Sequence, residues 1–70
     1  MRIREKFKYP GLVAEMARHG DTNKALGDKI GISREAVRLK VNGKNQWTIE
    51  EIEKICKVYK KDYYELFKGE

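Results

Sequence analysis

The segment from Asn23 to Asn42 constrains the fold of this chain more than any other stretch. Leu26 and Ile30, four residues apart, can share the buried face of a short helix, and Gly31 directly after them can end it. Ser33 can cap the start of a second helix soon afterwards. The segment therefore predicts two short helices joined by a tight turn.

The two predicted helices meet the requirements of a helix-turn-helix motif. This motif needs a tiny residue in its first helix, so that the second can cross closely, a glycine in the turn, and a buried β-branched residue in the second helix. Gly27, Gly31 and Val37 stand at these places. The apolar positions around them hold Leu26, Ile30 and Ile32. We therefore expect a helix-turn-helix core over residues 23–42.

Local signals for helix ends continue on both sides of this core. Pro10 fits the first turn of a helix, and Gly20 can supply the left-handed residue that ends it. Two more helices begin with a capping residue and a glutamate three positions later, at Thr48 with Glu51 and at Asp62 with Glu65. The apolar side of the helix after Thr48 is predicted to hold Ile49, Ile52, Ile55, Cys56 and Tyr59. Because strand-like alternation is absent, the predicted fold is all-α, a compact bundle of five short helices.

Positive charge is concentrated in the first two thirds of the chain. Residues 1–44 hold eleven Lys or Arg and five Asp or Glu, whereas the remaining residues hold five and six. Clustered cations attract polyanions and release counterions from nucleic acid, although a solvated face tuned for solubility explains the charge alone equally well. Residues 1–9 are interpreted as a basic arm that follows the DNA backbone or enters the minor groove, or as a frayed terminus. Residues 10–70 are the predicted DNA-binding domain.

On these motifs the chain resembles the phage repressor and Cro family of helix-turn-helix proteins. The resemblance extends from Leu12 to Phe67 and is carried by Thr22-Asn23, Leu26-Gly27, Gly31-Ile32-Ser33 and Asn42-Gly43. It implies a lambda repressor-like fold and a sequence-specific transcriptional regulator, Cro-like or a short phage or mobile-element repressor, which inserts the helix 33–42 into the major groove of an operator. The chain departs from the family pattern at Asn23, Gly27 and Lys40, where glutamine, alanine and an apolar residue are usual. The charge at Lys40 leaves the rotation of the second helix open by one position.

The resemblance assigns two sets of DNA contacts. Arg can bond to guanine, Glu can accept from cytosine, and an apolar tip can touch a thymine methyl. The expected base-reading residues are Arg34, Glu35, Arg38 and Leu39. The expected phosphate-contacting residues are Asn23, Ser33, Lys40, Asn42, Lys44 and Asn45. The alternative for the first set is an ordinary charged surface with a repelling Arg34–Arg38 pair, and for Ser33 and Asn42 it is capping alone.

The aromatic residues near the end of the chain exceed what a small core can use. An exposed patch formed by some of them is the expected homodimer surface, drawn from Tyr59, Tyr63, Tyr64 and Phe67. A two-fold dimer would match a palindromic operator. Trp47 is expected in the core as a hydrophobic staple, with a phosphate-contacting indole N–H as the alternative. A helix-turn-helix-shaped protein-interaction module, acting as an antitoxin, antirepressor or adaptor, is the alternative function.

Several classes of protein find no support in the sequence. The single cysteine, Cys56, and the single histidine, His19, supply neither a disulfide nor the ligands of a structural zinc site. No nucleophile with a base and no phosphate-cradling glycine loop is present, so we expect no enzyme, cofactor or small-molecule ligand. Without an apolar span or signal peptide, the expected location is the cytoplasm of a bacterial cell or phage-infected host, associated with the nucleoid.

Overall fold

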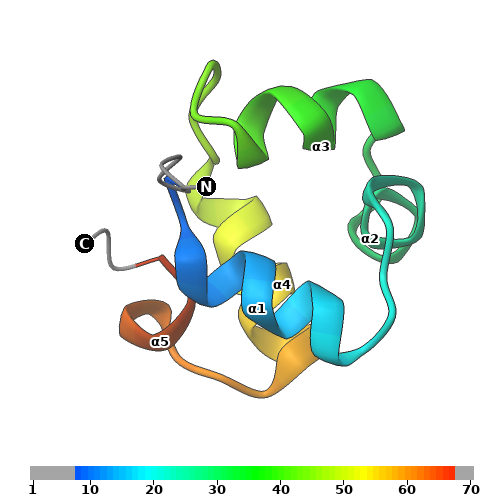
Figure 1. Ribbon diagram of the computed structural model, residues 1–70. Helices are drawn as coiled ribbons and strands as arrows, with labels where there is room; N and C mark the ends of the chain where they lie inside the picture. The colour runs from blue at the N-terminus through cyan, green and yellow to red at the C-terminus, as the bar shows by residue number, and fades with distance from the viewer. Residues whose placement is uncertain (1–7, 68–70) are drawn as a thin grey trace, which may run out of the picture.

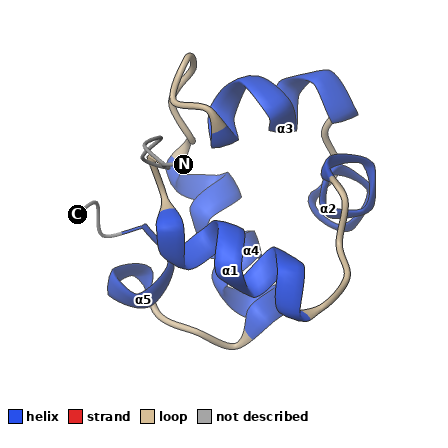
Figure 2. Cartoon of the chain, in the orientation of Figure 1, coloured by secondary structure: helices blue, strands red, loops and turns tan. Residues whose placement is uncertain are grey.

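The computed structural model describes residues 8–67, which form five α-helices and no strand (Figures 1 and 2). The helices are α1 (Pro10–Arg18), α2 (Asn23–Ile30), α3 (Arg34–Val41), α4 (Ile49–Tyr59) and α5 (Tyr63–Phe67). The predicted all-α fold is therefore confirmed. The predicted basic arm, residues 1–9, lies outside the described residues apart from Lys8 and Tyr9.

Side-chain caps begin the helices where the sequence predicts them. Thr22 accepts a hydrogen bond from the backbone N–H of the third residue after it at the start of α2, and Ser33 does the same for α3. Thr48 and Glu51 form the complete capping box at the start of α4. These bonds satisfy N–H groups that have no partner inside the helix. Local chemistry thus sets where each of these helices begins.

Left-handed residues close the turns between helices. Gly20, Gly31 and Gly43 have φ angles of 68°, 85° and 79°, a region that side chains disfavour. Lys60, which follows α4, has a φ of 57° and shows that α4 ends without the glycine that usually occupies this position. No sequence signal marked Lys60 for this conformation.

A single hydrophobic core joins all five helices. Its buried side chains are Leu12, Met16, Leu26, Ile30, Val37, Trp47, Ile55, Tyr59, Leu66 and Phe67. Gly11 lets α1 approach α5 closely, because a Cβ at this position would lie 2.0 Å from the carbonyl oxygen of Glu65. In Figure 1, α3 crosses the edge of the bundle opposite α5, and α4 lies behind α1. This arrangement leaves one side of α3 outside the core.

The structure corrects the predicted position of Ile49 and narrows the predicted aromatic patch. Ile49 was expected on the apolar side of α4, but 75% of it is exposed because it is the first residue of the helix and lies beyond the core. The exposed aromatic patch was expected to be drawn from four residues, of which Tyr59 and Phe67 are buried, and Tyr59 lies on the apolar side of α4 as predicted. Tyr63 and Tyr64 are the exposed members of that set, at 52% and 69%. Among residues 8–67, no helix is long and apolar enough to cross a membrane.

Candidate nucleic-acid interface

The crossing of α2 and α3 depends on the absence of a side chain at Gly27. A Cβ at this position would lie 2.5 Å from the carbonyl oxygen of Ile32 and 3.3 Å from the Cγ2 of Val37. The carbonyl oxygen of Gly27 also accepts hydrogen bonds from the N–H groups of Gly31 and Ile32, at 2.7 Å and 3.0 Å. The turn therefore packs directly onto α2, and α3, which begins directly after the turn, crosses close to Gly27.

The burial pattern of α3 defines its rotation. Val37 is completely buried between α2 and the rest of the core, and Val41 is partly buried. Arg34, Glu35 and Arg38 are exposed, which places three of the four predicted base-reading residues on one outward face. Leu39, the fourth predicted base reader, is partly buried. The outward face of α3 is thus formed by two arginines and a glutamate.

Two residues of this face already bind each other. The Glu35 carboxylate accepts hydrogen bonds from both Nε and Nη2 of Arg38, at 3.1 Å and 2.5 Å. The hydrogen bond from Arg38 is the main cause that lowers the pKa of Glu35 below its ordinary value, so both groups are charged at neutral pH. Repulsion between Arg34 and Arg38 was the expected strain on this helix, and Glu35 offsets it. The pair also orients the Arg38 guanidinium along the helix surface.

The ends of the motif supply exposed polar groups. Asn42, Lys44 and Asn45 are exposed in the loop after α3. The backbone N–H groups of Lys44 and Asn45 donate to the carbonyl oxygen of Leu39, at 2.8 Å and 3.3 Å. Because these two N–H groups are already paired, an anion beside this loop would bind the side chains of Lys44 and Asn45. Ser33 accepts its capping bond through Oγ, which leaves its hydroxyl proton to donate, and the cap predicted from sequence is present.

Most of the chain, including this motif, matches a known family. The chain matches the family described as the Cro/C1-type HTH DNA-binding domain over residues 12–68. It belongs to that family. Comparisons with curated proteins and with solved structures gave no match. Membership makes this protein a DNA-binding regulator of the Cro/C1 type, in agreement with the family resemblance of its sequence.

Lys40 lies in a different environment from the other predicted phosphate-contacting residues of this Cro/C1-type domain. Its ammonium group forms an ion pair with Glu51 of α4, and only 13% of each side chain is exposed. Asn23 at the start of α2 is partly buried, whereas the remaining members of the predicted set are exposed. The structure therefore leaves these five residues at the start of α2 and on either side of α3, and turns Lys40 toward α4.

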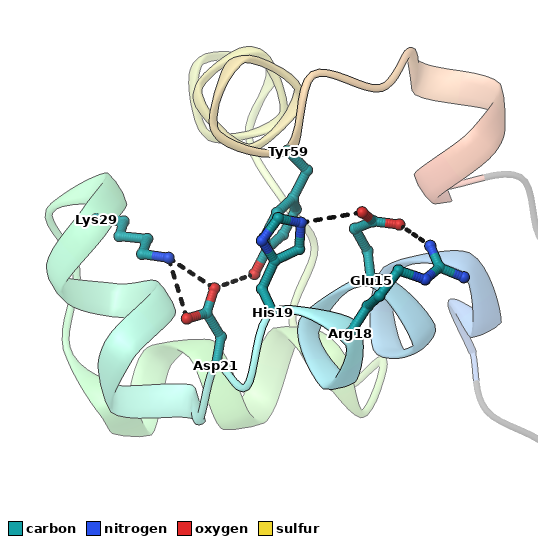
Figure 3. A network of polar contacts seen from close by, with 6 residues as sticks. All are labelled: Glu15, Arg18, His19, Asp21, Lys29 and Tyr59. Atoms are coloured by element: carbon teal, nitrogen blue, oxygen red, sulfur yellow. Dashed lines mark hydrogen bonds and ion pairs between the residues drawn. The ribbon is translucent and has the colours of Figure 1, made fainter.

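A polar network attaches α2 to the rest of the Cro/C1-type domain (Figure 3). The carboxylate of Asp21, in the loop before α2, accepts a hydrogen bond of 2.7 Å from the hydroxyl group of Tyr59 and bonds of 2.9 Å and 3.0 Å from Lys29. The bond from Lys29, together with that from Tyr59, holds the pKa of Asp21 below its ordinary value despite the burial of the carboxylate. Asp21 thus joins the second half of α2 to the end of α4. Sequence reasoning missed this network, since its partners are as far as 38 positions apart.

A neighbouring cluster on α1 contacts the same tyrosine. Glu15 is 5% exposed and accepts hydrogen bonds from Arg18 and, at 3.1 Å, from the ring of His19. The His19 ring lies 4.9 Å from that of Tyr59, which brings the two clusters side by side in Figure 3. Among residues 8–67, no group of three or more His, Cys, Asp or Glu residues is placed to hold a metal ion. Through these contacts the two clusters join α1, α2 and α4.

A small cavity lies beside the loop that follows α3. It has a volume of about 260 Å³ and is lined by side chains that include Lys8, Asn45, Trp47 and Phe67. The stem of Lys8 also packs where a Cβ of Gly43 would stand, 3.2 Å from Cγ. Lys8 and Tyr9, the described residues of the predicted arm, therefore lie beside the loop after α3. Trp47 itself is buried, as predicted.

Proposed function

We propose that this regulator binds double-stranded operator DNA sequence-specifically by inserting α3 into the major groove. The outward face of Arg34, Glu35 and Arg38 on a packed helix-turn-helix is the observation that carries this proposal. Arginine can bond bidentately to guanine and glutamate can accept from cytosine, so this face offers two donors and one acceptor to base edges. Leu39, which is partly buried, is proposed to make an apolar contact with a thymine methyl.

The Glu35–Arg38 ion pair gives this proposal a specific consequence. The Glu35 carboxylate takes the Nε–H and one Nη2–H of Arg38, so the remaining N–H groups of Nη1 and Nη2 can bond the O6 and N7 atoms of guanine while the pair holds the guanidinium in place. The second lone pairs of the same carboxylate can accept from the amino group of a cytosine. The two residues are therefore coupled in base reading, and loss of Glu35 changes the preference at the position that Arg38 contacts.

Phosphate contacts complete the proposed interface. The residues proposed for them are Asn23 at the start of α2, Ser33 directly before α3, and Asn42, Lys44 and Asn45 after α3. Such contacts fix the register of the protein on the duplex and make affinity fall steeply with salt. They distinguish poorly between sequences, in contrast to the contacts of α3.

The proposed biological role is repression by occupancy of an operator, as in short phage repressors. We further propose a homodimer, in which two α3 helices lie about 34 Å apart and contact the half-sites of a palindrome. The exposed Tyr63 and Tyr64 of α5 support a dimer surface there, with the buried Tyr59 and Phe67 no longer part of it. Sedimentation of wild type and Tyr63→Ser over a range of concentrations tests this surface; a monomer at all concentrations would contradict it.

Selection of bound sequences from a random DNA pool tests the function directly. Enrichment of a palindromic sequence is expected, and binding should weaken steeply with salt. On the selected sequence, Arg38→Ala should cost about 1–3 kcal/mol and relax the preference at one base pair, whereas Lys44→Ala should weaken all sequences alike. Lys57→Ala, which removes an exposed charge from α4, is the matched control and should leave binding nearly unchanged. No enrichment, together with salt-insensitive binding to a protein, would instead support an interaction module.

A further inference from the structure

One ion pair joins the end of the helix that faces DNA to the start of the next helix. The ammonium group of Lys40 on α3 lies 2.5 Å and 2.7 Å from the two carboxylate oxygens of Glu51 on α4. Both side chains are 13% exposed, so the pair is largely removed from water. Water and salt screen such a contact less than an ion pair on the open surface. It therefore constrains the distance between the two helices.

Glu51 is itself held in place by the start of α4. Its carboxylate accepts a bond of 3.0 Å from the N–H of Thr48, and its own N–H donates to Thr48 Oγ1 at 3.1 Å. The capping box and the ion pair thus share one carboxylate. Because the cap fixes the rotamer of Glu51, the position of its oxygens defines where Lys40, and with it the end of α3, can lie.

Trp47 closes the same contact from the other side. The Lys40 ammonium lies 5.8 Å from the centre of the Trp47 ring, within the range of a cation–π interaction. Trp47 in turn packs edge-on against Phe67 of α5, with ring centres 6.0 Å apart. The end of α3 is therefore tied to α4 by charge and to the core by the indole ring. These contacts hold together the two ends of the loop formed by residues 42–48.

We propose that Lys40 is a positioning residue, whose ion pair with Glu51 sets the orientation of α3 and so the reach of Arg34 and Arg38 into the groove. Lys40 then governs affinity without touching a phosphate, in contrast to the role expected from its sequence position. This inference rests on the proposed function, since it concerns how α3 is presented to DNA. The contact differs from the Asp21 network, which joins α2 to the other end of α4.

The substitutions Lys40→Met and Glu51→Gln separate positioning from phosphate contact. Gln preserves the capping box at this position, so the second substitution removes the charge of Glu51 and leaves the start of α4 intact. If Lys40 positions α3, each substitution weakens operator binding. The expected loss of affinity is about tenfold, which corresponds to the middle of the range of interaction energies between coupled residues. If Lys40 binds phosphate, Glu51→Gln instead strengthens binding, because it releases the ammonium group.

The slope of log affinity against log salt gives a second, independent criterion. A positioning role leaves the slope at its wild-type value in Lys40→Met, whereas loss of one phosphate contact reduces the slope by about 0.9. Lys40→Arg, which can keep the ion pair, should retain most of the affinity. Tyr59→Phe is the matched control for lowered stability alone. It removes the hydroxyl group that donates to Asp21 and should leave operator affinity unchanged.

The measurements are made on the selected operator at a temperature where circular dichroism shows every variant folded. The intrinsic emission of Trp47, the single tryptophan, should change in Lys40→Met and stay unchanged in Tyr59→Phe. Wild-type affinity in Glu51→Gln, or a reduced salt slope in Lys40→Met, would overturn the positioning role while the proposed function stands. Failure of the wild-type chain to bind any selected DNA would overturn the proposed function instead.

Discussion

The close contact between α1 and α5 makes Gly11→Ala a sensitive test of the packing described above. A Cβ at Gly11 would lie 2.0 Å from the carbonyl oxygen of Glu65, 3.1 Å from its carbonyl carbon and 3.3 Å from the Cα of Leu66. All three neighbours are backbone atoms, so no side chain can rotate away. An ordinary contact between non-bonded atoms needs about 3.5 Å, so the helices must separate by roughly 1.5 Å at this point.

The expected cost follows from two opposing effects. Overpacking of a tight contact costs about 1–3 kcal/mol. Replacement of glycine by alanine in a helix recovers up to about 1 kcal/mol, and less in the first turn, where Gly11 lies. The net loss of unfolding free energy is therefore about 1–2 kcal/mol. For a domain of this size, such a loss lowers Tm by about 5–15 °C.

Thermal unfolding followed by circular dichroism measures this loss, with Ala14→Gly as the matched control. Ala14 is exposed on the same helix, so its replacement removes helix propensity without changing any close contact. Helix propensity alone predicts that Gly11→Ala raises Tm and that Ala14→Gly lowers it. Close packing predicts that both lower it. A Tm for Gly11→Ala at or above that of the wild type would refute the proposed contact between α1 and α5.

Three further predictions concern other polar contacts. The hydrogen bonds from Lys29 and Tyr59 hold the pKa of Asp21 below its ordinary value of 3.8. The ionised Asp21 carboxylate therefore stabilises the fold fully at pH values well above 3.8, and this stabilisation is lost on acidification. Asp21→Asn should lower Tm near pH 7 and make Tm depend less on pH in the acid range. Burial, and then the hydrogen bond to Asp21, raises the pKa of Tyr59 far above its ordinary 10, so Tyr59→Phe should remove the last step of an ultraviolet pH titration. Thr48→Ala should cost about 1 kcal/mol in urea unfolding through loss of the capping box, and an unchanged midpoint would contradict the role of the cap.

The ends of the helices were the most predictable part of this fold. Caps such as Ser33 and Thr48 act on N–H groups within three residues, so the sequence contains both partners side by side. A glycine such as Gly31 likewise adopts its left-handed conformation for local reasons. The bundle of short helices could therefore be predicted from neighbouring residues, and the structure confirms it.

The direction that each side chain faces was less predictable, because it depends on partners far along the chain. Helical spacing placed Ile49 on the same side of α4 as Ile55, yet the core does not extend to the first turn of α4 and leaves Ile49 in solvent. The same spacing placed Tyr59 on that side correctly, but it did not identify the Asp21 carboxylate, 38 positions away, that accepts a hydrogen bond from the buried hydroxyl group. Apolar spacing alone contains no information about where the core ends or about the Asp21 carboxylate.

Lys40 shows how the same limit affects the candidate site. Its charge, at a place where the family pattern favours an apolar residue, left the rotation of α3 open between two settings. The structure resolves this, because Lys40 turns inward to Glu51 while Val37 remains buried, and Arg34 and Arg38 stay outside. A lysine can occupy this largely buried position because the capping box already holds a carboxylate there, and its stem packs as an apolar side chain would. The charge of Lys40, which departs from the family pattern, is therefore compensated by Glu51, a residue that the sequence analysis identified only as part of the capping box.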